Sequence, residues 1–283
     1  MKPSVSVIVT LYKDLKALEV VLDALERQTH KAFEIVIAED DDAVGTIDFL
    51  QAYRHLNIVH IFQPDTGRNK VKIQNKAIVK ASGEYLFFLD GDIVPFKHFI
   101  EYSLDIAQKG QVLAGRRVNL PQELTEAIKN SESSPETIED NYLSFLLKYR
   151  RNREVRADQG IELNPNGFLF KLLSKRKRNT EILGCNFSCF KEDIVTINGF
   201  DEEYHPLATL ADDTDLSWRL KGMGFTLKSS KNIANVFHLW HKEGTGNEDF
   251  NPKEDLALFN KNKKDKKYIC NNGLNKYLKE NND

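Results

Sequence analysis

Two aspartates stand at the end of a segment that has the composition of a buried strand. Residues 85–89 (YLFFL) are all apolar or aromatic, and Asp90-Gly91-Asp92 follows them directly. Carboxylates are almost never fully buried unless they are paired or bound to a metal. Because Gly91 leaves space between the two side chains, both can turn toward one hard cation, such as Mg2+ or Mn2+. A solvated strand-to-loop turn can have the same sequence, so the motif alone leaves both interpretations open.

A second acidic cluster offers candidates for acid–base chemistry. Asp212, Asp213 and Asp215 crowd the start of residues 213–221, where the leucine spacing predicts a helix. The helix macrodipole favours acidic residues at this position, and Asp212 could cap the helix. These structural roles account for one or two of the three aspartates. A general base must be a carboxylate or a histidine near the proton that it removes. Asp213 is a candidate on that ground, although the pattern does not choose among the three.

Two histidines accompany another strand-like run. His238 lies within NVFHLW at residues 235–240, and His241 follows it. A lone histidine is more often a core or surface residue than a ligand, and an i, i+3 pair is not a zinc signature. A histidine that joins one or two aspartates can nevertheless bind a divalent ion.

The sequence has no glycine-rich loop of the kind that commonly binds phosphate. The chain contains neither a P-loop nor a G-x-S-x-G elbow. Phosphate would therefore be bound by a metal together with basic side chains. Arg68, Lys70 and Lys72 lie shortly before the acidic pair.

The first hundred residues alternate between two hydrophobic periods, and this predicts the elements that position these groups. Buried strands are predicted at residues 5–11, 33–39, 57–62 and 84–90, and helices at residues 14–28 and 70–82. Such alternation is typical of parallel strands with helices on both faces of the sheet. Ligands bind beyond the carboxyl ends of such strands, where Glu39-Asp40 and Asp90-Asp92 both lie.

Composition sets limits on the function. The hydrophobic fraction of 41%, the charged fraction of 29% and the net charge of -2 are typical of a soluble protein without a general affinity for nucleic acid. The three cysteines are odd in number and lack zinc-ribbon spacing, which favours a reducing compartment. Neither a signal peptide nor a run of ~20 apolar residues is evident, so we expect a cytoplasmic protein, with the inner face of the membrane as a further possibility.

Taken in order, four segments resemble glycosyltransferase family 2, a group of inverting, nucleotide-sugar-dependent enzymes with the GT-A fold. The segments are residues 4–41, 67–95, 184–220 and 237–241. The first resembles the opening strand–helix–strand of the family, the second its D-x-D segment, and the third its acceptor side with an acidic helix. The last resembles the closing histidine of the branch that includes galactosyltransferases and chondroitin-type polymerases.

The resemblance implies a role for each matched position. Contacts to the nucleoside would come from Thr10, Leu11, Tyr12, Glu39 and Asp40, and contacts to the donor phosphates from Arg68, Lys72 and Asn75. Asp90 and Asp92, spaced by Gly91, would bind Mn2+ or Mg2+ together with His238. Asp213 would be the base and Asp212 would orient the acceptor. Trp240 and Trp218 are available for sugar stacking, although core packing is the expected role of Trp218.

Three departures from the family pattern stand out. The Arg-Asn pair of the family is Gln74-Asn75 here, so a diphosphate contact would have to come from Arg68 or Lys72. The segment HPLATLA replaces a glycine- and tryptophan-rich approach to the acidic helix, and Asp41 replaces a glycine.

The expected organisation is a single GT-A α/β domain over residues 1–283, with one Rossmann-like, mostly parallel sheet flanked by helices. Residues 1–115 would bind the donor, 116–180 would form an irregular basic insert, 181–259 would bind the acceptor, and 260–283 would form a tail. The insert would be a solvated surface, or would contact an anionic membrane surface or acceptor.

The resemblance implies sugar transfer from a nucleotide sugar, most commonly a UDP-sugar, to a glycan or lipid-linked acceptor, with bacterial surface polysaccharide assembly as the setting. Two alternatives remain. Residues 90–94 also satisfy the D-x-D-x-[TV] signature of haloacid-dehalogenase-type phosphotransferases, with Asp90 as nucleophile. A non-catalytic nucleotide-sugar-binding relative would share the same motifs.

Overall fold

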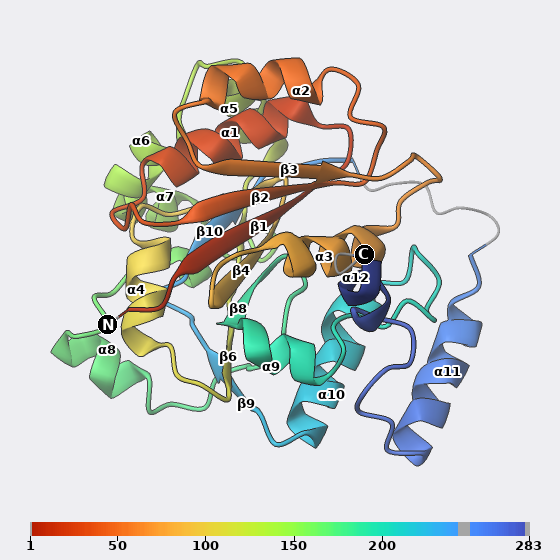
Figure 1. Ribbon diagram of the computed structural model, residues 1–283. Helices are drawn as coiled ribbons and strands as arrows, with labels where there is room; N and C mark the ends of the chain where they lie inside the picture. The colour runs from red at the N-terminus through yellow and green to blue at the C-terminus, as the bar shows by residue number, and fades with distance from the viewer. Residues whose placement is uncertain (1, 243–249, 281–283) are drawn as a thin grey trace.

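A seven-stranded sheet forms the centre of the computed structural model, which describes residues 2–242 and 250–280 (Figure 1). Its strand order is β3-β2-β1-β4-β8-β6-β9. In this order the strands are β3 (Ile58–Phe62), β2 (Glu34–Glu39), β1 (Val5–Leu11), β4 (Tyr85–Asp90), β8 (Asn186–Phe190), β6 (Gln111–Ala114) and β9 (Thr226–Ser229). The four strands predicted from the sequence are all present and run parallel to one another. β8 is antiparallel to both β4 and β6, so the predicted mostly parallel sheet is confirmed.

Helices cover both faces of the sheet. They are α1 (Leu15–Glu26), α2 (Thr46–Phe49), α3 (Lys70–Lys80), α4 (Phe99–Ile106), α5 (Gln122–Lys129), α6 (Pro135–Asp140), α7 (Tyr142–Tyr149), α8 (Phe168–Leu173), α9 (Lys191–Thr196), α10 (Leu216–Gly222), α11 (Pro252–Lys264) and α12 (Asn275–Glu280). Asp14 caps α1 as predicted, because its carboxylate accepts a hydrogen bond of 2.9 Å from the Ala17 N–H. In the described residues, no helix is long and apolar enough to cross a membrane.

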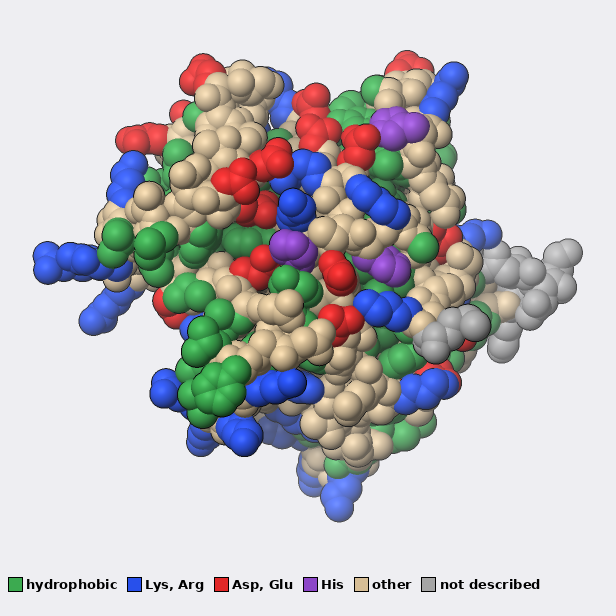
Figure 2. All heavy atoms as spheres, turned by 90° about the vertical axis from the view of Figure 1, so that its left-hand side faces the viewer, with side chains coloured by type: hydrophobic (Ala, Val, Ile, Leu, Met, Phe, Trp, Pro, Cys, Tyr) green, Lys and Arg blue, Asp and Glu red, His purple; other side chains and the backbone are tan. Residues whose placement is uncertain are grey.

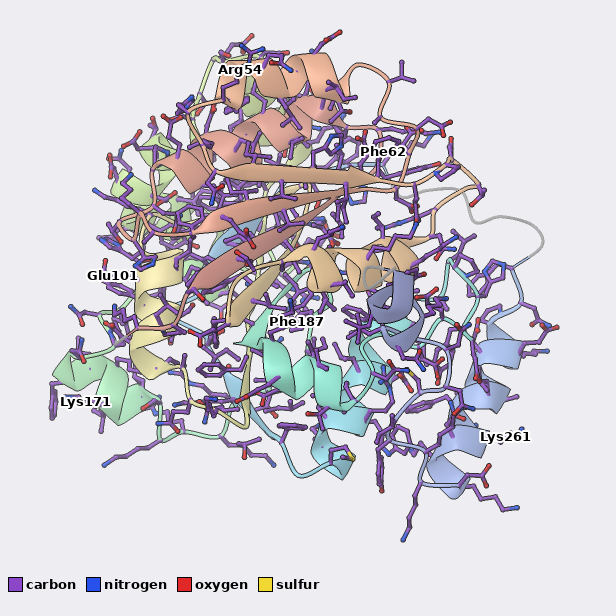
Figure 3. The ribbon with its side chains drawn as sticks, in the orientation of Figure 1. Arg54, Phe62, Glu101, Lys171, Phe187 and Lys261 are labelled. Atoms are coloured by element: carbon purple, nitrogen blue, oxygen red, sulfur yellow. The ribbon has the colours of Figure 1, made fainter. Side chains whose placement is uncertain are left out.

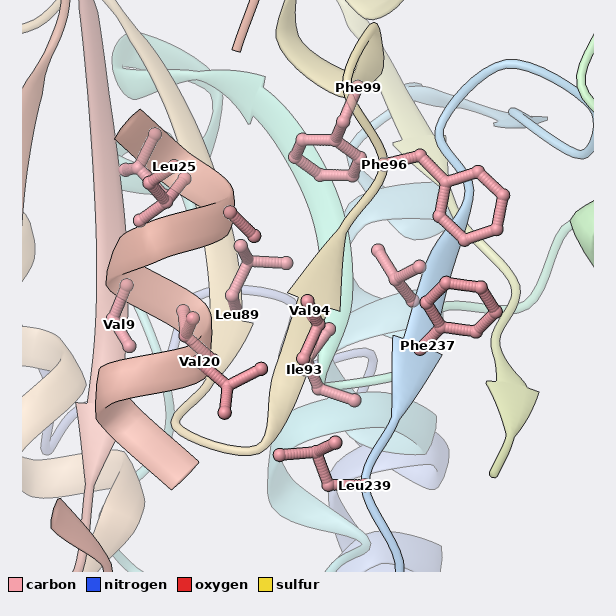
Figure 4. Close-up of a cluster of buried hydrophobic side chains, with 14 of the residues drawn as sticks. Val9, Val20, Leu25, Leu89, Ile93, Val94, Phe96, Phe99, Phe237 and Leu239 are labelled. Atoms are coloured by element: carbon pink, nitrogen blue, oxygen red, sulfur yellow. The ribbon is translucent and has the colours of Figure 1, made fainter. Parts of the chain in front are cut away.

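Burial on both faces explains the uninterrupted apolar runs of β1, β2 and β4. The prediction of burial was wrong for β3, which lies at the edge of the sheet and is only partly buried, with Phe62 52% exposed. Alternate residues of β1 contribute to two different cores: Val7 and Val9 face one, and Ile8 faces the other. The first core also holds the apolar face of α1, including Val20 (Figure 4). The second holds Ile73 of α3. Strands buried in this way need no polar residues along their length, so a polar residue at a strand end marks the place where the core stops.

Residues 116–180 contain more regular structure than their sequence pattern indicates. They hold the short strand β7 (Val118–Asn119) and helices α5 to α8, of six to eight residues each. Ile128, Ile138 and Phe145 from these helices are buried in the first core. A helix of two turns shows too few periods to stand out in the sequence, which is why the segment looked irregular.

A small second sheet positions the acidic motif. After β4 the chain turns through Gly91 and Asp92 into β5 (Ile93–Pro95). β5 pairs antiparallel with β10 (Val236–His238), which also pairs with β7. The register sets Ile93 opposite His238, and the Leu239 N–H donates to the Asp92 carbonyl oxygen at 3.0 Å. The second sheet therefore brings the D-x-D turn against the segment that carries the two histidines.

Candidate active site

Six of the residues predicted from the sequence meet in one cavity of about 960 Å3 at the carboxyl end of β4. They are Arg68, Asp90, Asp92, Asp212, Asp213 and His238. Lys70, Arg117, Gly184, Trp240 and His241 also line this cavity. It therefore joins the donor-side and acceptor-side motifs, which lie more than a hundred residues apart in the chain.

A carboxylate and two imidazoles converge on one side of the cavity. Asp92 Oδ2 lies 3.4 Å from Nε2 of His238 and 3.3 Å from Nε2 of His241. The potential ligand atoms of these three residues all lie within 4.8 Å of one another. Burial would raise the pKa of Asp92, but the hydrogen bond from His238 and the charges of both histidines outweigh it and hold that pKa below its usual value. Asp92 is therefore ionised at neutral pH, as a metal ligand must be.

The turn between Asp90 and Asp92 requires glycine. The Gly91 N–H donates to the Thr10 carbonyl oxygen at 2.7 Å, and a Cβ on Gly91 would lie 2.8 Å from the same oxygen. Real Cβ atoms essentially never come this close to a backbone atom. The glycine thus lets the D-x-D turn pack directly on the end of β1.

We expect Gly91→Ala to move this turn away from β1. The added methyl group must displace backbone, so the free energy of unfolding should fall by about 1–3 kcal/mol. Because Asp92 belongs to the same turn, the affinity of the Asp92, His238 and His241 cluster for a divalent cation such as Mn2+ would also fall. Urea denaturation and calorimetric Mn2+ titration would measure the two effects. A variant with unchanged stability and Mn2+ affinity would contradict the close packing described here.

Lys70 links the two acidic motifs. Its Nζ lies 2.7 Å from Oδ1 of Asp90 and 2.7 Å from Oδ2 of Asp212. Thr10 Oγ1 donates to the same Asp90 oxygen at 2.9 Å. Burial would lower the pKa of Lys70, but the two adjacent carboxylates outweigh it and raise that pKa above its usual value. Lys70 is therefore a fixed cation that holds Asp90 and Asp212 at one point.

The acidic cluster begins with a π-helical turn rather than directly with the predicted α-helix. In residues Ala211–Asp215 the Asp215 N–H donates to the Leu210 carbonyl oxygen at 2.9 Å, and α10 begins after this turn. Such turns are wider than an α-helix and are frequent at functional sites. Here Asp212 and Asp213 both line the cavity.

Asp213 has the electrostatic environment of a general base. Burial, followed by the negative charge of Asp212, raises its pKa above the usual value, and hydrogen bonds from Thr214 only partly offset this. A carboxylate with a raised pKa is a stronger base than an ordinary aspartate. Among the described residues, Asp213 forms an ion pair with neither Lys70 nor a histidine, whereas Asp212 is held by Lys70.

The raised pKa of Asp213 predicts a pH dependence. As a general base, Asp213 would act in its unprotonated form, so kcat would fall as the pH falls through this pKa, at a higher pH than for an ordinary aspartate. Asp212→Asn removes a neighbouring negative charge, so it should move the acidic limb of the kcat profile to lower pH. Measurement of kcat against pH for both proteins checks this. An acidic limb that stays in place, or moves to higher pH, would contradict the assigned cause.

The residues predicted to contact the nucleoside lie at the ends of β1 and β2 and are not part of the cavity lining, although Thr10 contacts the lining residue Asp90. Glu39 is buried, accepts from Thr46 Oγ1 at 2.6 Å, and lies 2.7 Å from Nε2 of His60. Asp40 accepts from Gln63 Nε2 at 2.6 Å.

The other residues at these strand ends differ in exposure. Asp40 also accepts from the Asn69 N–H, and burial raises its pKa. Leu11 is buried at the end of β1, whereas Tyr12 is 38% exposed just beyond it. The carboxylates of Glu39 and Asp40 thus already have hydrogen-bond partners within the protein.

The proposed phosphate contacts separate into two groups. Arg68 is exposed and lines the cavity. Asn75 is fully buried, and its Nδ2 donates to the Phe200 carbonyl oxygen at 2.9 Å and to Glu202 Oε1 at 2.7 Å. Lys72 lies on α3 outside the cavity lining. The structure therefore places Arg68 at the cavity, whereas Asn75 forms hydrogen bonds within the protein interior.

Lys70 and His241 contact the predicted aspartates of the site but were not assigned a role from the sequence. His241 follows the strand that carries His238, and only the pairing of β10 with β5 shows that both imidazoles reach Asp92. Lys70 stood among three basic residues with nothing to distinguish it. Of the tryptophans, Trp240 lines the cavity, and Trp218 packs against Phe259 as expected.

Comparison with known proteins defines the class that this geometry belongs to. The fold is that of the GT-A glycosyltransferases, as solved structures show. TarS of S. aureus in complex with UDP-GlcNAc superposes with a TM-score of 0.59 at 17% identity, over 90% of this chain and 64% of that one. The mannosyltransferase PcManGT from Pyrobaculum calidifontis, in complex with GDP-Man and Mn2+, gives a TM-score of 0.54 at 16% identity, over 86% of this chain and 59% of that one.

Sequence comparison gives the family. The profile of glycosyl transferase family 2 matches residues 6–182, and a profile described as the N-terminal domain of galactosyltransferase matches residues 169–242. The amylovoran biosynthesis glycosyltransferase AmsB of Erwinia amylovora is 26% identical over 277 residues, which cover 85% of this chain and 92% of AmsB. The chain belongs to glycosyl transferase family 2. This membership confirms the resemblance drawn from the motifs and disfavours the phosphotransferase alternative.

Proposed function

We propose that the chain is an inverting glycosyltransferase that moves a sugar from a nucleotide sugar, with UDP as the expected nucleotide, to a hydroxyl group of a glycan or lipid-linked acceptor. The observation that carries the proposal is the single cavity in which a potential metal site, Asp92–His238–His241, faces the candidate base Asp213. In such a displacement a metal on the donor side stabilises the leaving group, and a base on the acceptor side removes the proton of the attacking hydroxyl.

The donor set fits a divalent transition metal. Asp92 would bind through its ionised carboxylate, and His238 and His241 through Nε2. Two imidazole nitrogens suit Mn2+ better than Mg2+, which prefers oxygen ligands. When bound, the metal supplies positive charge that stabilises the departing nucleoside diphosphate. The neighbour PcManGT, solved with GDP-Man and Mn2+, supports this assignment by analogy.

The chain's own side chains would carry out the rest of the transfer. Arg68 would neutralise charge on the diphosphate, and Lys70 would hold Asp90 and Asp212 in fixed positions. Asp213 would accept the proton of the acceptor hydroxyl as its oxygen forms a bond to the anomeric carbon. The bond from that carbon to the diphosphate oxygen breaks, and the nucleoside diphosphate leaves with the electron pair. Attack from the opposite face inverts the anomeric centre.

The acceptor side is consistent with a carbohydrate. Trp240 is 40% exposed in the cavity lining, and such an indole can stack on a sugar ring. The relative AmsB is named for amylovoran biosynthesis, which supports polysaccharide assembly as the setting. We propose a saccharide acceptor on these grounds.

A thermal-shift screen of nucleotide sugars tests the donor part of the proposal. At least one UDP-sugar should raise the Tm of the wild type in the presence of Mn2+, and less so with EDTA. Asp92→Ala should lose the Mn2+-dependent part of the shift. Stabilisation that does not depend on metal, or no stabilisation by any nucleotide sugar, would refute the metal-dependent mechanism.

Transfer assays separate the enzyme from a non-catalytic relative. Release of UDP from the stabilising donor, alone and with saccharide acceptors, should be detectable for the wild type. Donor binding without UDP release under any of these conditions would favour the non-catalytic alternative. NMR of the product would report inversion or retention at the anomeric carbon.

A further inference from the structure

The short helix α8 presents three large apolar side chains to solvent. Phe168, Leu169 and Leu172 are 77%, 60% and 50% exposed. At about 100° per residue they occupy roughly 100° of the helix circumference, so they form one continuous face. Single exposed leucines are ordinary on protein surfaces, but a face of this kind indicates an interaction site.

The opposite side of α8 is anchored to the protein. Phe170 is buried, and the Arg178 guanidinium lies 5.9 Å from the centroid of its ring. Arg178 also donates to the Lys231 carbonyl oxygen at 2.6 Å and to Asn232 Oδ1 at 3.1 Å. These contacts hold the helix in place with its apolar face outward.

Basic side chains lie on α8 and directly after it in the chain. Residues 163–180 contain five Lys and Arg residues and no Asp or Glu, although the whole chain has a net charge of -2. Lys171, Lys175, Arg176 and Lys177 are all exposed. In Figure 1, α8 lies at the left of the molecule, and on that side, drawn in Figure 2, hydrophobic side chains lie among Lys and Arg side chains.

We propose that α8 and the basic segment after it, residues 168–177, form a docking surface for an anionic lipid bilayer. The apolar face would enter the boundary between headgroups and acyl chains, while the cations contact lipid phosphates. Local charge favours this occupant over an apolar protein partner, because four exposed cations on and directly after an apolar helix face match a continuous negative surface. The surface lies outside the cavity, so the proposal is independent of the transfer reaction.

Vesicle sedimentation tests the proposal with the full chain. Wild type should bind vesicles containing phosphatidylglycerol, bind phosphatidylcholine vesicles at least tenfold more weakly, and be released by high salt. Phe168→Ser with Leu172→Ser should lower the partition coefficient at least tenfold. Lys175→Gln with Lys177→Gln should lower it by about tenfold or more, and most strongly at low salt.

A matched control comes from α11 on the other side of the molecule. Leu256 is 51% exposed there, and Lys261 projects from the same helix, away from Lys171 of α8 (Figure 3). Leu256→Ser with Lys261→Gln should leave vesicle binding unchanged. Absence of binding to anionic vesicles, equal losses in the control, or wild-type binding by both α8 variants would overturn the proposal. So would self-association of the wild type, seen by light scattering, that the Phe168→Ser, Leu172→Ser variant abolishes without any vesicle binding.

Discussion

Asp213→Asn is expected to reduce kcat by about 10²–10⁴-fold while leaving donor binding nearly unchanged. Asparagine has almost the same shape as aspartate but cannot accept the proton of the acceptor hydroxyl. Asp213 is the cavity carboxylate with a raised pKa, caused by burial and by Asp212. The metal-capable cluster around Asp92 lies elsewhere in the lining and would be unaffected. Steady-state kinetics with the donor identified by the screen would measure kcat.

The comparison needs a control for the substitution itself. Asp48→Asn changes an exposed aspartate of α2, outside the cavity lining, and should retain wild-type kcat. Mn2+-dependent binding of UDP, measured by calorimetry, should be equal in all three proteins. If Asp213→Asn keeps full transfer activity, the base is another residue and the assignment is wrong.

Arg219→Met is expected to lower the free energy of unfolding by about 3–5 kcal/mol, because it leaves Asp215 as an uncompensated buried charge. Both side chains are completely buried, and Arg219 Nε lies 2.5 Å from Asp215 Oδ2. Arg219 Nη1 also donates to the carbonyl oxygens of Ile197 and Gly199, at 3.0 and 2.8 Å. The pair joins the π-helical turn that carries Asp213 to the loop after α9, so its loss should also reduce activity.

A double variant distinguishes the charge from the packing. Asp215→Leu with Arg219→Met removes both charges, so it should recover part of the lost stability. Recovery should be incomplete, because two carbonyl groups lose their donor. Lys109→Met breaks an ion pair in which both side chains are more than half exposed, and it should leave stability nearly unchanged. Urea denaturation measures all three. A loss for Arg219→Met as small as that for Lys109→Met would contradict the account.

The sequence predicted the elements that depend on local pattern. The buried runs of β1, β2 and β4, the partly buried edge strand β3 and the capped helix α1 are continuous segments whose hydrophobic pattern is local. The acidic motif at the end of β4 was identifiable for the same reason, since an apolar run that stops at carboxylates marks the edge of the core.

Features that depend on long-range pairing were not predictable from the pattern. The contact of His241 with Asp92 requires the antiparallel pairing of β5 and β10. The sequence indicated a strand around β10, but it revealed neither the three-residue strand β5 nor its pairing with β10. The bridge from Lys70 to Asp90 and Asp212 joins positions up to 142 residues apart. Lysine is common on helix surfaces, so only the tertiary structure distinguishes this one.

The most direct test of the central claim is anomalous diffraction from a crystal of the protein with Mn2+ and UDP. We expect an anomalous peak within coordination distance of Asp92 Oδ2, His238 Nε2 and His241 Nε2, with the diphosphate adjacent to it and Asp213 facing the remaining part of the cavity. A peak at another place, or bound UDP with no metal at these three side chains, would contradict the proposed site.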